Sequence, residues 1–247
     1  MQVDIAQLDI ELGDKKANMR KALDIIEKSK ADLILFPELF TTGMDLANSA
    51  DLAEPIDGET VQALTDACGR KMIAGSFIES DGRWLHNTFV LIDDTGVIGK
   101  YRKIHLFQEE KHHFAHGDKV TVLDTHFGKI GFAVCYDLRF PEMFRKMMSM
   151  EAEFVLLCAN FPKIRKMHWE TLVKARAIEN QFYILACNRV GKDLRNEYAG
   201  RSMAVDPAGN LLAVGEDREE MLHCTVDRKT VKELRHSFPV LPDIRLK

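Results

Sequence analysis

The sequence predicts an α/β fold with a mixed rather than purely parallel sheet. Its first half alternates apolar runs of strand character with segments whose apolar residues recur at helical spacing, and strands then follow one another through short turns. Alternation with helices favours parallel pairing, whereas turn-linked strands favour antiparallel pairing. With 247 residues and 46% hydrophobic content, the chain is long enough for one large core, so residues 1–247 are expected to form one domain.

The first half is expected to contain helices at residues 18–29 and 60–70. Its expected strands cover residues 1–8, 32–36, 72–78, 84–92 and 97–101. Pro37 ends the second strand and leaves Glu38 just beyond it, as the only charge within residues 33–40. Such an apolar setting favours a carboxylate that acts as a general base.

The second half is expected to begin with a polar loop at residues 108–118 and a hairpin-like pair of strands. Its expected strands cover residues 120–124, 129–134, 154–159, 182–187, 202–205, 211–214 and 220–226, the last of which closes the sheet. Helices are expected at residues 143–150 and 163–181. Four apolar residues of the longer helix are expected to face the core, namely Ile164, Met167, Ala175 and Ile178. From about residue 227 we expect a short helix and a tail, whose two prolines exclude it from a sheet interior.

Charge and cysteine content narrow the function classes. The net charge is −4 with both signs interspersed, so neither nucleic-acid binding nor membrane binding is expected. The five cysteines are widely spaced and lack a Cys-x-x-Cys pair, which argues against a disulfide framework and a thiolate zinc site. The N-terminal stretch carries an acid where a signal peptide carries a base, and no apolar run approaches the roughly 20 residues of a membrane span. We expect a cytoplasmic protein that acts on small molecules without a metal or cofactor.

Cys135 is the candidate nucleophile. It ends the apolar run at residues 129–134, after which the chain turns into a helix-like segment. Open α/β sheets collect ligands at the carboxyl ends of strands, and a sharp strand-to-helix turn presents a side chain beside backbone N–H groups. A lone cysteine after an apolar run is also compatible with a small core residue. We expect Asp137 to cap the turn and Arg139 to pair with Glu142 within it.

Glu38, Lys103 and Cys135 each follow a predicted strand. If the three strand ends share one sheet edge, a single pocket holds a base, a cation and a thiol. These groups suffice for acyl transfer, because the cation lowers the thiol pKa from about 8.5 and the carboxylate passes the thiol proton to a leaving amine. The two cysteines inside apolar strands, Cys158 and Cys187, are expected to be structural.

Three segments resemble the signature segments of the nitrilase superfamily of carbon–nitrogen hydrolases, and they occur in that family's order. They are residues 36–40 (FPELF), 101–107 (YRKIHLF) and 135–142 (CYDLRFPE). Residues 168–172 (HWETL), 175–181 (ARAIENQ) and 188–191 (NRVG) also follow the family pattern. The resemblance implies a four-layer α-β-β-α sandwich with mixed sheets. It also implies a homodimer or higher homo-oligomer, formed through the helical face.

The resemblance implies a role for each matching residue. Glu38 would be the general base, Lys103 the stabilising cation and Cys135 the nucleophile. Glu110 matches the family's second glutamate and would orient Lys103 and the substrate. The backbone N–H of Tyr136 would form an oxyanion hole together with Lys103. An amide would thus be hydrolysed to a carboxylic acid and ammonia through a thioester.

Within the superfamily, the Cys-Tyr-Asp string at residues 135–137 resembles amidases, since nitrilases usually show Cys-Trp-Glu. The downstream pattern resembles bacterial omega-amidases, which cleave the terminal amide of 2-oxoglutaramate and 2-oxosuccinamate. Asn160 and Phe161 are the expected substrate contacts, and Phe161 departs from the tryptophan often found there in omega-amidases. An aliphatic amidase or an N-carbamoyl amino acid amidohydrolase is the alternative within the superfamily.

A metal-dependent hydrolase is the alternative from another class. Four histidines fall in one stretch of the chain, at His105, His112, His113 and His116. Clustered imidazoles ligate zinc in many proteins, but this spacing matches no zinc signature. The intact Glu38, Lys103 and Cys135 positions favour thiol chemistry over this alternative and over a catalytically silent binding protein.

Overall fold

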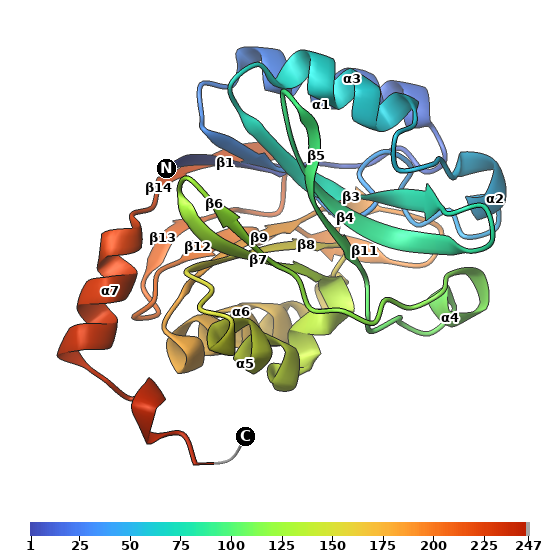
Figure 1. The fold of residues 1–247 in the computed structure, drawn as a ribbon. Helices are drawn as coiled ribbons and strands as arrows, with labels where there is room; N and C mark the ends of the chain where they lie inside the picture. Colours follow the sequence, from blue (N-terminus) through green and yellow to red (C-terminus); the bar gives the residue numbers. More distant parts are fainter. Residues whose placement is uncertain (246–247) are drawn as a thin grey trace.

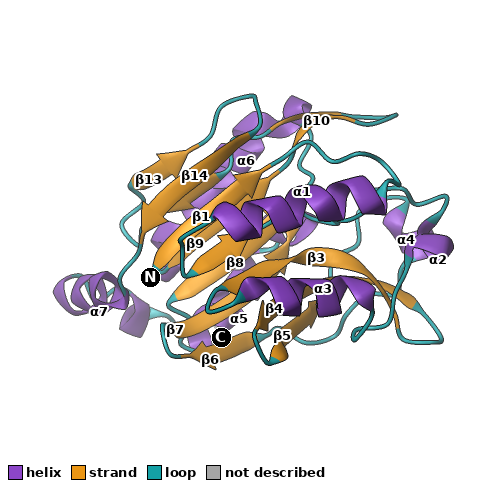
Figure 2. Cartoon of the chain, turned by 90° about the horizontal axis from the view of Figure 1, so that it is seen from above, coloured by secondary structure: helices purple, strands orange, loops and turns teal. Residues whose placement is uncertain are grey.

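Two six-stranded sheets pack face to face in the centre of the molecule (Figure 1). The structure is a computed structural model that describes residues 1–245. Helices α1 (Lys15–Lys28) and α3 (Glu59–Cys68) cover the outer face of one sheet, as Figure 2 shows from above. Helices α5 (Pro141–Ser149) and α6 (Lys166–Asn180) cover the outer face of the other sheet. The predicted four-layer α/β sandwich with mixed sheets is therefore confirmed.

The first sheet has the strand order β14-β1-β2-β3-β4-β5. Its strands are β1 (Gln2–Gln7), β2 (Leu33–Leu35), β3 (Met72–Ser80), β4 (Leu85–Asp93), β5 (Gly96–Arg102) and β14 (Glu220–Thr225). Strands β1, β2 and β3 run parallel, with α1 and α3 in their crossovers, while β4, β5 and β14 pair antiparallel. The strand predicted at residues 220–226 closes this sheet at its β1 edge, as expected.

The second sheet has the strand order β13-β12-β9-β8-β7-β6. Its strands are β6 (Val122–Thr125), β7 (Gly128–Val134), β8 (Phe154–Ala159), β9 (Tyr183–Asn188), β12 (Met203–Val205) and β13 (Leu211–Val214). Strands β7, β8 and β9 run parallel and are buried along their length, apart from one half-buried residue in β7. Near-continuous apolar runs are typical of strands covered on both faces, which is why the sequence identified these three.

The inner faces of the two sheets form one apolar core. Phe89 of β4 and Phe132 of β7 stack across it with their ring centroids 4.9 Å apart, and neither side chain is exposed. A close-packed interior of this kind resists changes in the separation of the two sheets. The core therefore fixes where strand ends of one sheet lie relative to those of the other.

Helix α6 faces the core with a different set of residues from the predicted one. Ile164, Met167 and Ile178 are 88%, 71% and 51% exposed, so the predicted buried face is wrong. The buried residues of the helix are Trp169, Val173, Arg176, Ala177 and Asn180. The prediction from apolar spacing failed because the buried face includes a charged side chain and an amide, Arg176 and Asn180, which a search for apolar residues leaves out. The Arg176 guanidinium is satisfied there by the Leu138 carbonyl oxygen at 3.1 Å.

Several short elements were not predicted. They are α2 (Ser49–Leu52), α4 (Glu110–His113), β10 (Val190–Lys192), β11 (Glu197–Ala199) and the 3₁₀ segments Cys135–Arg139 and Leu241–Asp243. The helix expected at residues 163–181 begins with a 3₁₀ turn, Lys163–Arg165, before α6. Helix α7 (Arg228–Ser237) is the short helix expected after residue 227, and its Val231 is fully buried in the core. Within residues 1–245, no helix is both long enough and apolar enough to span a membrane.

Candidate active site

Four strand ends meet at one end of the sandwich. In the first sheet, Glu38 lies beyond β2 and Lys103 directly follows β5. In the second sheet, Cys135 directly follows β7 and Asn160 directly follows β8. The predicted strand ends therefore do not share one sheet edge. They face one another across two sheets, because the packing of the sandwich brings the two edges together.

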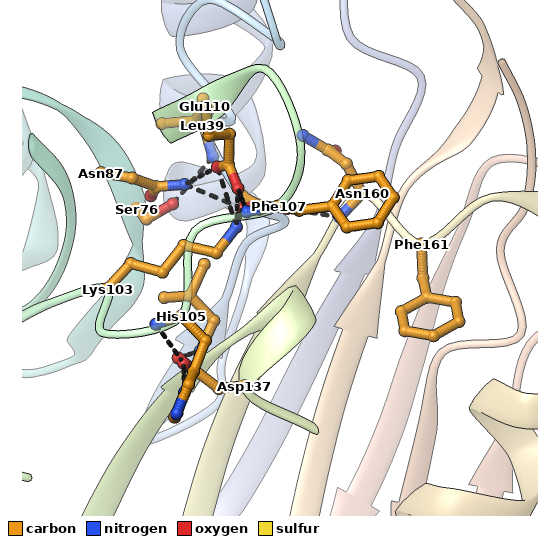
Figure 3. A network of polar contacts seen from close by, with 12 residues as sticks. Leu39, Ser76, Asn87, Lys103, His105, Phe107, Glu110, Asp137, Asn160 and Phe161 are labelled. Atoms are coloured by element: carbon orange, nitrogen blue, oxygen red, sulfur yellow. Dashed lines mark hydrogen bonds and ion pairs between the residues drawn. The ribbon is translucent and has the colours of Figure 1, made fainter. Parts of the chain in front are cut away.

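A buried ion cluster joins Lys103 to two glutamates. Lys103 Nζ lies 2.7 Å from Glu38 Oε1 and 2.8 Å from each carboxylate oxygen of Glu110. Lys103, Glu38 and Glu110 are only 1%, 0% and 3% exposed. Figure 3 shows Lys103 pointing toward Glu110, with Asn87 beside them. Because water is excluded, these charges interact with little screening, and loss of Lys103 would leave two buried carboxylates without a counter-ion.

Neutral donors hold both carboxylates in place. Asn87 Nδ2 donates to Glu38 Oε1 at 2.8 Å and lies 3.3 Å from Glu110 Oε1. The Phe107 N–H donates to Glu110 at 2.6 Å, and the Asn160 N–H donates to Glu38 Oε2 at 2.9 Å. The sequence analysis missed Asn87, which stands between His86 and Thr88 in β4 and which no sequence pattern distinguishes from these polar neighbours.

Burial and charge act in opposite directions on the cluster. Burial alone would lower the pKa of Lys103, but Glu110 and Glu38 together hold that pKa well above its ordinary value. Burial raises the pKa of Glu110, and the Lys103 ammonium opposes this rise. Lys103 is therefore a permanently charged donor at the inner end of the site.

Cys135 sits on a strained turn between β7 and α5. Its φ is 45°, in the left-handed region that residues other than glycine seldom adopt. The residue is 9% exposed and lines a cavity. Tyr136 follows in the first turn of the 3₁₀ segment, where backbone N–H groups have no acceptor within the helix. The sharp strand-to-helix turn expected for the nucleophile is present.

The thiol of Cys135 is not acidified by its surroundings. Burial, followed by the nearby Glu38 carboxylate, raises its pKa well above the ordinary value, and Lys103 only partly opposes this. Lys103 lowers the thiol pKa, as expected, but burial and Glu38 raise it by more, so the expected net lowering of this pKa is wrong for this chain. In the free protein the thiol is protonated, so attack on a substrate requires a base.

Asp137 connects the two sheets beside the site. Its Oδ2 accepts from the Tyr101 hydroxyl at 2.8 Å and from the Val134 N–H at 2.9 Å. Its Oδ1 accepts from the His105 N–H at 3.1 Å and lies 2.8 Å from the His105 Nδ1. Tyr101 and His105 flank Lys103 in the chain, while Val134 directly precedes the nucleophile. Asp137 thus does more than the expected capping: it fixes the lysine segment against the nucleophile turn.

A cavity of about 200 Å³ contains Cys135 and Lys103 in its lining. Arg139, Arg165 and Arg195 also line it, together with Asp45, Glu109 and Asp193. Asp193 accepts from the Tyr198 hydroxyl at 2.6 Å and Asp45 from the Asn48 amide at 2.8 Å, so these two carboxylates already have partners. Arg195 comes from the tip of the β10–β11 hairpin, and Arg165 lies 5.7 Å from the centroid of the Phe107 ring. A cavity with this lining suits a short molecule that carries an anionic group at one end.

Asn160 and Phe161, the expected substrate contacts, both line the cavity. Phe161 packs on Trp169 with ring centroids 5.3 Å apart, and Figure 3 shows its ring turned away from the ion cluster. The Arg139 guanidinium lies 5.1 Å from the centroid of the Phe161 ring. The expectation that Arg139 pairs with Glu142 is wrong, because the 3₁₀ turn directs Arg139 toward the cavity. Contact of Asn160 and Phe161 with substrate stays a prediction.

The four histidines weighed as metal ligands do not come together. Among residues 1–245, no group of three or more histidine, cysteine, aspartate or glutamate side chains is arranged to hold a metal ion. His105 is bonded to Asp137, and His112 and His113 lie exposed on α4. Cys158 and Cys187, expected to be structural, are fully buried in β8 and β9.

Comparison with known proteins identifies relatives over the whole length of the chain. The family profile described as carbon-nitrogen hydrolase matches residues 2–236. The 2-oxoglutaramate amidase of Bacillus subtilis is 38% identical, covering 97% of this chain and 95% of the relative. The omega-amidase YafV of Yersinia enterocolitica is 36% identical, covering 93% and 91%. The crystal structure of XC1258 from Xanthomonas campestris, a CN-hydrolase superfamily protein, superposes with a TM-score of 0.94 at 28% identity, covering 100% and 98%.

An α-β-β-α sandwich with a cysteine, a lysine and two glutamates at the meeting point of its sheets defines a hydrolase of carbon–nitrogen bonds other than peptide bonds. The chain belongs to the carbon–nitrogen hydrolase family, the nitrilase superfamily. The resemblance that the three signature segments indicated is confirmed.

Proposed function

We propose that the protein is an omega-amidase that hydrolyses the terminal amide of 2-oxoglutaramate or 2-oxosuccinamate to a carboxylic acid and ammonia. The observation that carries the proposal is the cavity that combines Cys135 and Lys103 with three arginines in its lining. The names of the two relatives, 2-oxoglutaramate amidase and omega-amidase, support it. Both substrates pair a terminal carboxamide with a carboxylate, and such a molecule needs reactive groups at one end of its site and cations at the other.

Acylation begins with proton transfer. Glu38 takes the Cys135 proton, the sulfur attacks the amide carbonyl carbon, and the carbonyl π electrons move to oxygen. When the tetrahedral species collapses, the C–N bond breaks and Glu38 gives its proton to the departing nitrogen. The raised pKa of the Cys135 thiol makes this base necessary. Ammonia leaves, and a thioester remains on Cys135.

The oxyanion is held by two donors. Lys103 and the backbone N–H of Tyr136 bind the negative oxygen as it forms. Glu110 holds Lys103 through both of its oxygens and thereby sets the direction of the ammonium toward the substrate. Deacylation reuses the same groups, since Glu38 removes a proton from water and the resulting hydroxide attacks the thioester.

The far end of the substrate meets the guanidinium groups. Arg139 is the principal partner of the carboxylate, because it is half-buried and directly follows the nucleophile turn. Arg165 and Arg195 add positive charge at the cavity wall. Asn160 contacts the substrate beside the reacting groups, and Phe161 contacts it between the two ends. An uncharged aliphatic amide would form no ion pair with these guanidinium groups.

The proposed function is tested by ammonia release from a panel of amides. The panel contains ω-amides of short 2-oxo acids, aliphatic amides, N-carbamoyl amino acids and nitriles, each assayed with wild type and Cys135→Ala. Cys135-dependent release from the 2-oxo acid amides, unaffected by a chelator, is expected. Release confined to aliphatic amides, carbamoyl compounds or nitriles would overturn the substrate assignment. Activity lost to the chelator but retained in Cys135→Ala would overturn the thiol mechanism.

We further propose a homodimer or higher homo-oligomer formed through the helical face of the second sheet. Ile164 and Met167 expose apolar side chains there, at 88% and 71%. Large apolar side chains clustered on a surface are typical of protein interfaces. Sedimentation of wild type beside Ile164→Glu tests this, since a monomeric wild type would contradict the proposal.

We also propose that the enzyme is cytoplasmic and that residues 1–247 act as one catalytic domain. Support for the compartment comes from the cysteines, all five of which are unpaired with one another. The single domain is supported by the cavity lining, which extends along the chain from Leu12 to Tyr198.

A further inference from the structure

The side chain of Asn160 is buried without a hydrogen-bond partner. The residue is 5% exposed, and neither its Nδ2 nor its Oδ1 has a partner within residues 1–245. Burying an amide without compensation costs on the order of 1–3 kcal/mol, so such groups are rare unless a ligand completes them.

Other buried amides with an unpartnered atom differ from Asn160. Asn87, Asn180 and Gln181 each leave one oxygen unpartnered, but the amide nitrogen of each donates to a neighbouring group. Only the Asn160 side chain, among these four, has both ends open. Two of the four, Asn87 and Asn160, border the reacting groups. Of these two, only Asn160 lines the cavity.

The backbone of Asn160 places the residue beside the base and the nucleophile. The Asn160 N–H donates to Glu38 Oε2 at 2.9 Å, and Asn160 lines the same cavity as Cys135. Figure 3 shows the Asn160 side chain on the side of Glu110, whereas Phe161 turns the other way. The open amide therefore borders the space where a group leaves from, or attacks, a carbonyl carbon bonded to Cys135.

We propose that Asn160 is a catalytic residue that binds the leaving ammonia during acylation and the attacking water during deacylation. This inference rests on the proposed amide hydrolysis through a Cys135 thioester. In acylation, Asn160 Oδ1 accepts a hydrogen bond from an N–H of the departing nitrogen, which turns the nitrogen lone pair toward the protonated Glu38. In deacylation, water takes the place of ammonia, one O–H pointing to Glu38 and the other to Asn160 Oδ1.

The hydrogen bonds to Glu38 and to Asn160 Oδ1 fix both O–H bonds of the water, and they thereby fix the direction of its lone pair. The lone pair then points at the thioester carbon, a C–O bond forms, and the C–S bond breaks with the proton returning from Glu38 to sulfur. Without Asn160, Glu38 still removes the proton, but the water rotates about a single hydrogen bond. Loss of such orientation costs about 10²-fold in rate.

The test adds hydroxylamine to the reaction, so that the thioester reacts either with water to give the acid or with hydroxylamine to give the hydroxamate. The ratio of hydroxamate to acid is measured. The substrate is whichever panel amide wild type hydrolyses, so failure of the 2-oxo acid amides would affect the proposed function and leave this test intact. For Asn160→Ala we expect the acid-forming step to slow by about 10²-fold, the thioester to accumulate by intact-protein mass, and the ratio of hydroxamate to acid to rise. KM should not rise, and it should fall to the extent that the thioester accumulates.

Two further variants separate this role from a structural one. Asn160→Leu replaces the open amide by an apolar group of similar shape, so it should melt no lower than wild type while showing the same change in product ratio. Asn180→Ala removes a buried amide outside the cavity and should keep the wild-type ratio. A wild-type product ratio in Asn160→Leu, or a raised KM as the sole effect of both Asn160 variants, would overturn the proposal.

Discussion

The floor and the rim of the cavity are built in different ways. The floor consists of Glu38, Lys103 and Glu110, which are at most 3% exposed and bonded to one another at 2.7–2.8 Å. The rim carries Arg139, which is half-buried, and Arg195, which is exposed at a hairpin tip. The floor is built from residues that follow β2 and β5 of the first sheet and from α4, and it faces Cys135 at the end of β7 in the second sheet. The rim is assembled from short turns and a small hairpin.

This difference separates chemistry from substrate choice. Charges in a water-excluded floor act strongly and move little, so they set the reaction. Charges on a solvated rim are screened and adjust to what they meet, so they set which acid is bound. Floor substitutions should therefore lower kcat for every amide, and rim substitutions should raise KM for anionic amides alone.

The largest effect is expected at the nucleophile. Cys135→Ala should lower turnover by about 10⁴-fold or more, because no thioester forms. Cys158→Ala, which removes a buried thiol from β8, should keep turnover and lose about 1 kcal/mol of unfolding free energy. Ammonia release and denaturant unfolding measure the pair. Comparable turnover in Cys135→Ala and wild type would rule out the thiol mechanism.

Lys103→Gln should have the next largest effect. It removes an oxyanion donor, for which a loss of about 10²–10³-fold in kcat is typical. It also leaves Glu38 and Glu110 without a cation, so the unfolding free energy should fall by about 3–5 kcal/mol. Lys100→Gln is the matched control, since Lys100 pairs with Glu79 near the surface. If both lysine variants lost kcat equally, the floor would have no special role.

Arg139→Gln should act on binding. Losing a charge-assisted bond to a carboxylate costs about 1.5–3 kcal/mol, so KM for anionic ω-amides should rise by about 10–10²-fold. Neutral amides should be unaffected, as should kcat. Arg83→Gln, at Trp84 and outside the cavity lining, is the control. An equal rise in KM for neutral amides would show that Arg139 shapes the cavity and does not bind the anion.

The pH dependence of alkylation shows whether Cys135 is a thiol or a thiolate in the free protein. Burial and Glu38 raise the pKa of Cys135, so below that pKa the thiol is protonated. Alkylation by iodoacetamide should be slow at pH 7 and rise about tenfold per pH unit into the alkaline range. A plateau already reached at pH 6 would show a preformed thiolate and contradict the floor described here.

The smallest effect is expected at the edge of the rim. Arg195→Gln removes an exposed charge, and exposed pairs contribute about 0.2–1 kcal/mol. KM for anionic amides should therefore rise only about two- to fivefold, and the rise should vanish in 0.5–1 M salt as screening increases. An effect as large as that of Arg139→Gln would mean that the hairpin closes over the substrate.

The sequence predicted the floor better than the rim for a physical reason. Glu38, Lys103 and Cys135 stand at the ends of buried strands, which apolar runs reveal, and their flanking segments resembled family signatures. Asn87 was missed because it stands between two other polar residues of β4, His86 and Thr88, and no pattern distinguishes it from them. The role of Asp137 in joining two sheets was missed because a hydrogen bond across 36 residues leaves no local pattern.

The rim could not be predicted, because short elements have little periodicity. The β10–β11 hairpin has strands of three residues each, too few for an alternating pattern. Arg139 was assigned to an ion pair from its distance along the chain, while its direction depends on the 3₁₀ turn. Helix α6 was turned the wrong way because its buried stripe contains Arg176 and Asn180.

The stack of Phe89 on Phe132 has a consequence for evolution. Lys103 extends from the first sheet and Cys135 from the second, so the gap between sulfur and ammonium depends on the thickness of the core. A substitution that thins or swells the core by a methylene group alters this gap without touching the cavity. Substitutions in the core during evolution are therefore constrained by the turnover of the enzyme as well as by its stability. Pairs of core substitutions that compensate for each other in volume should be selected together.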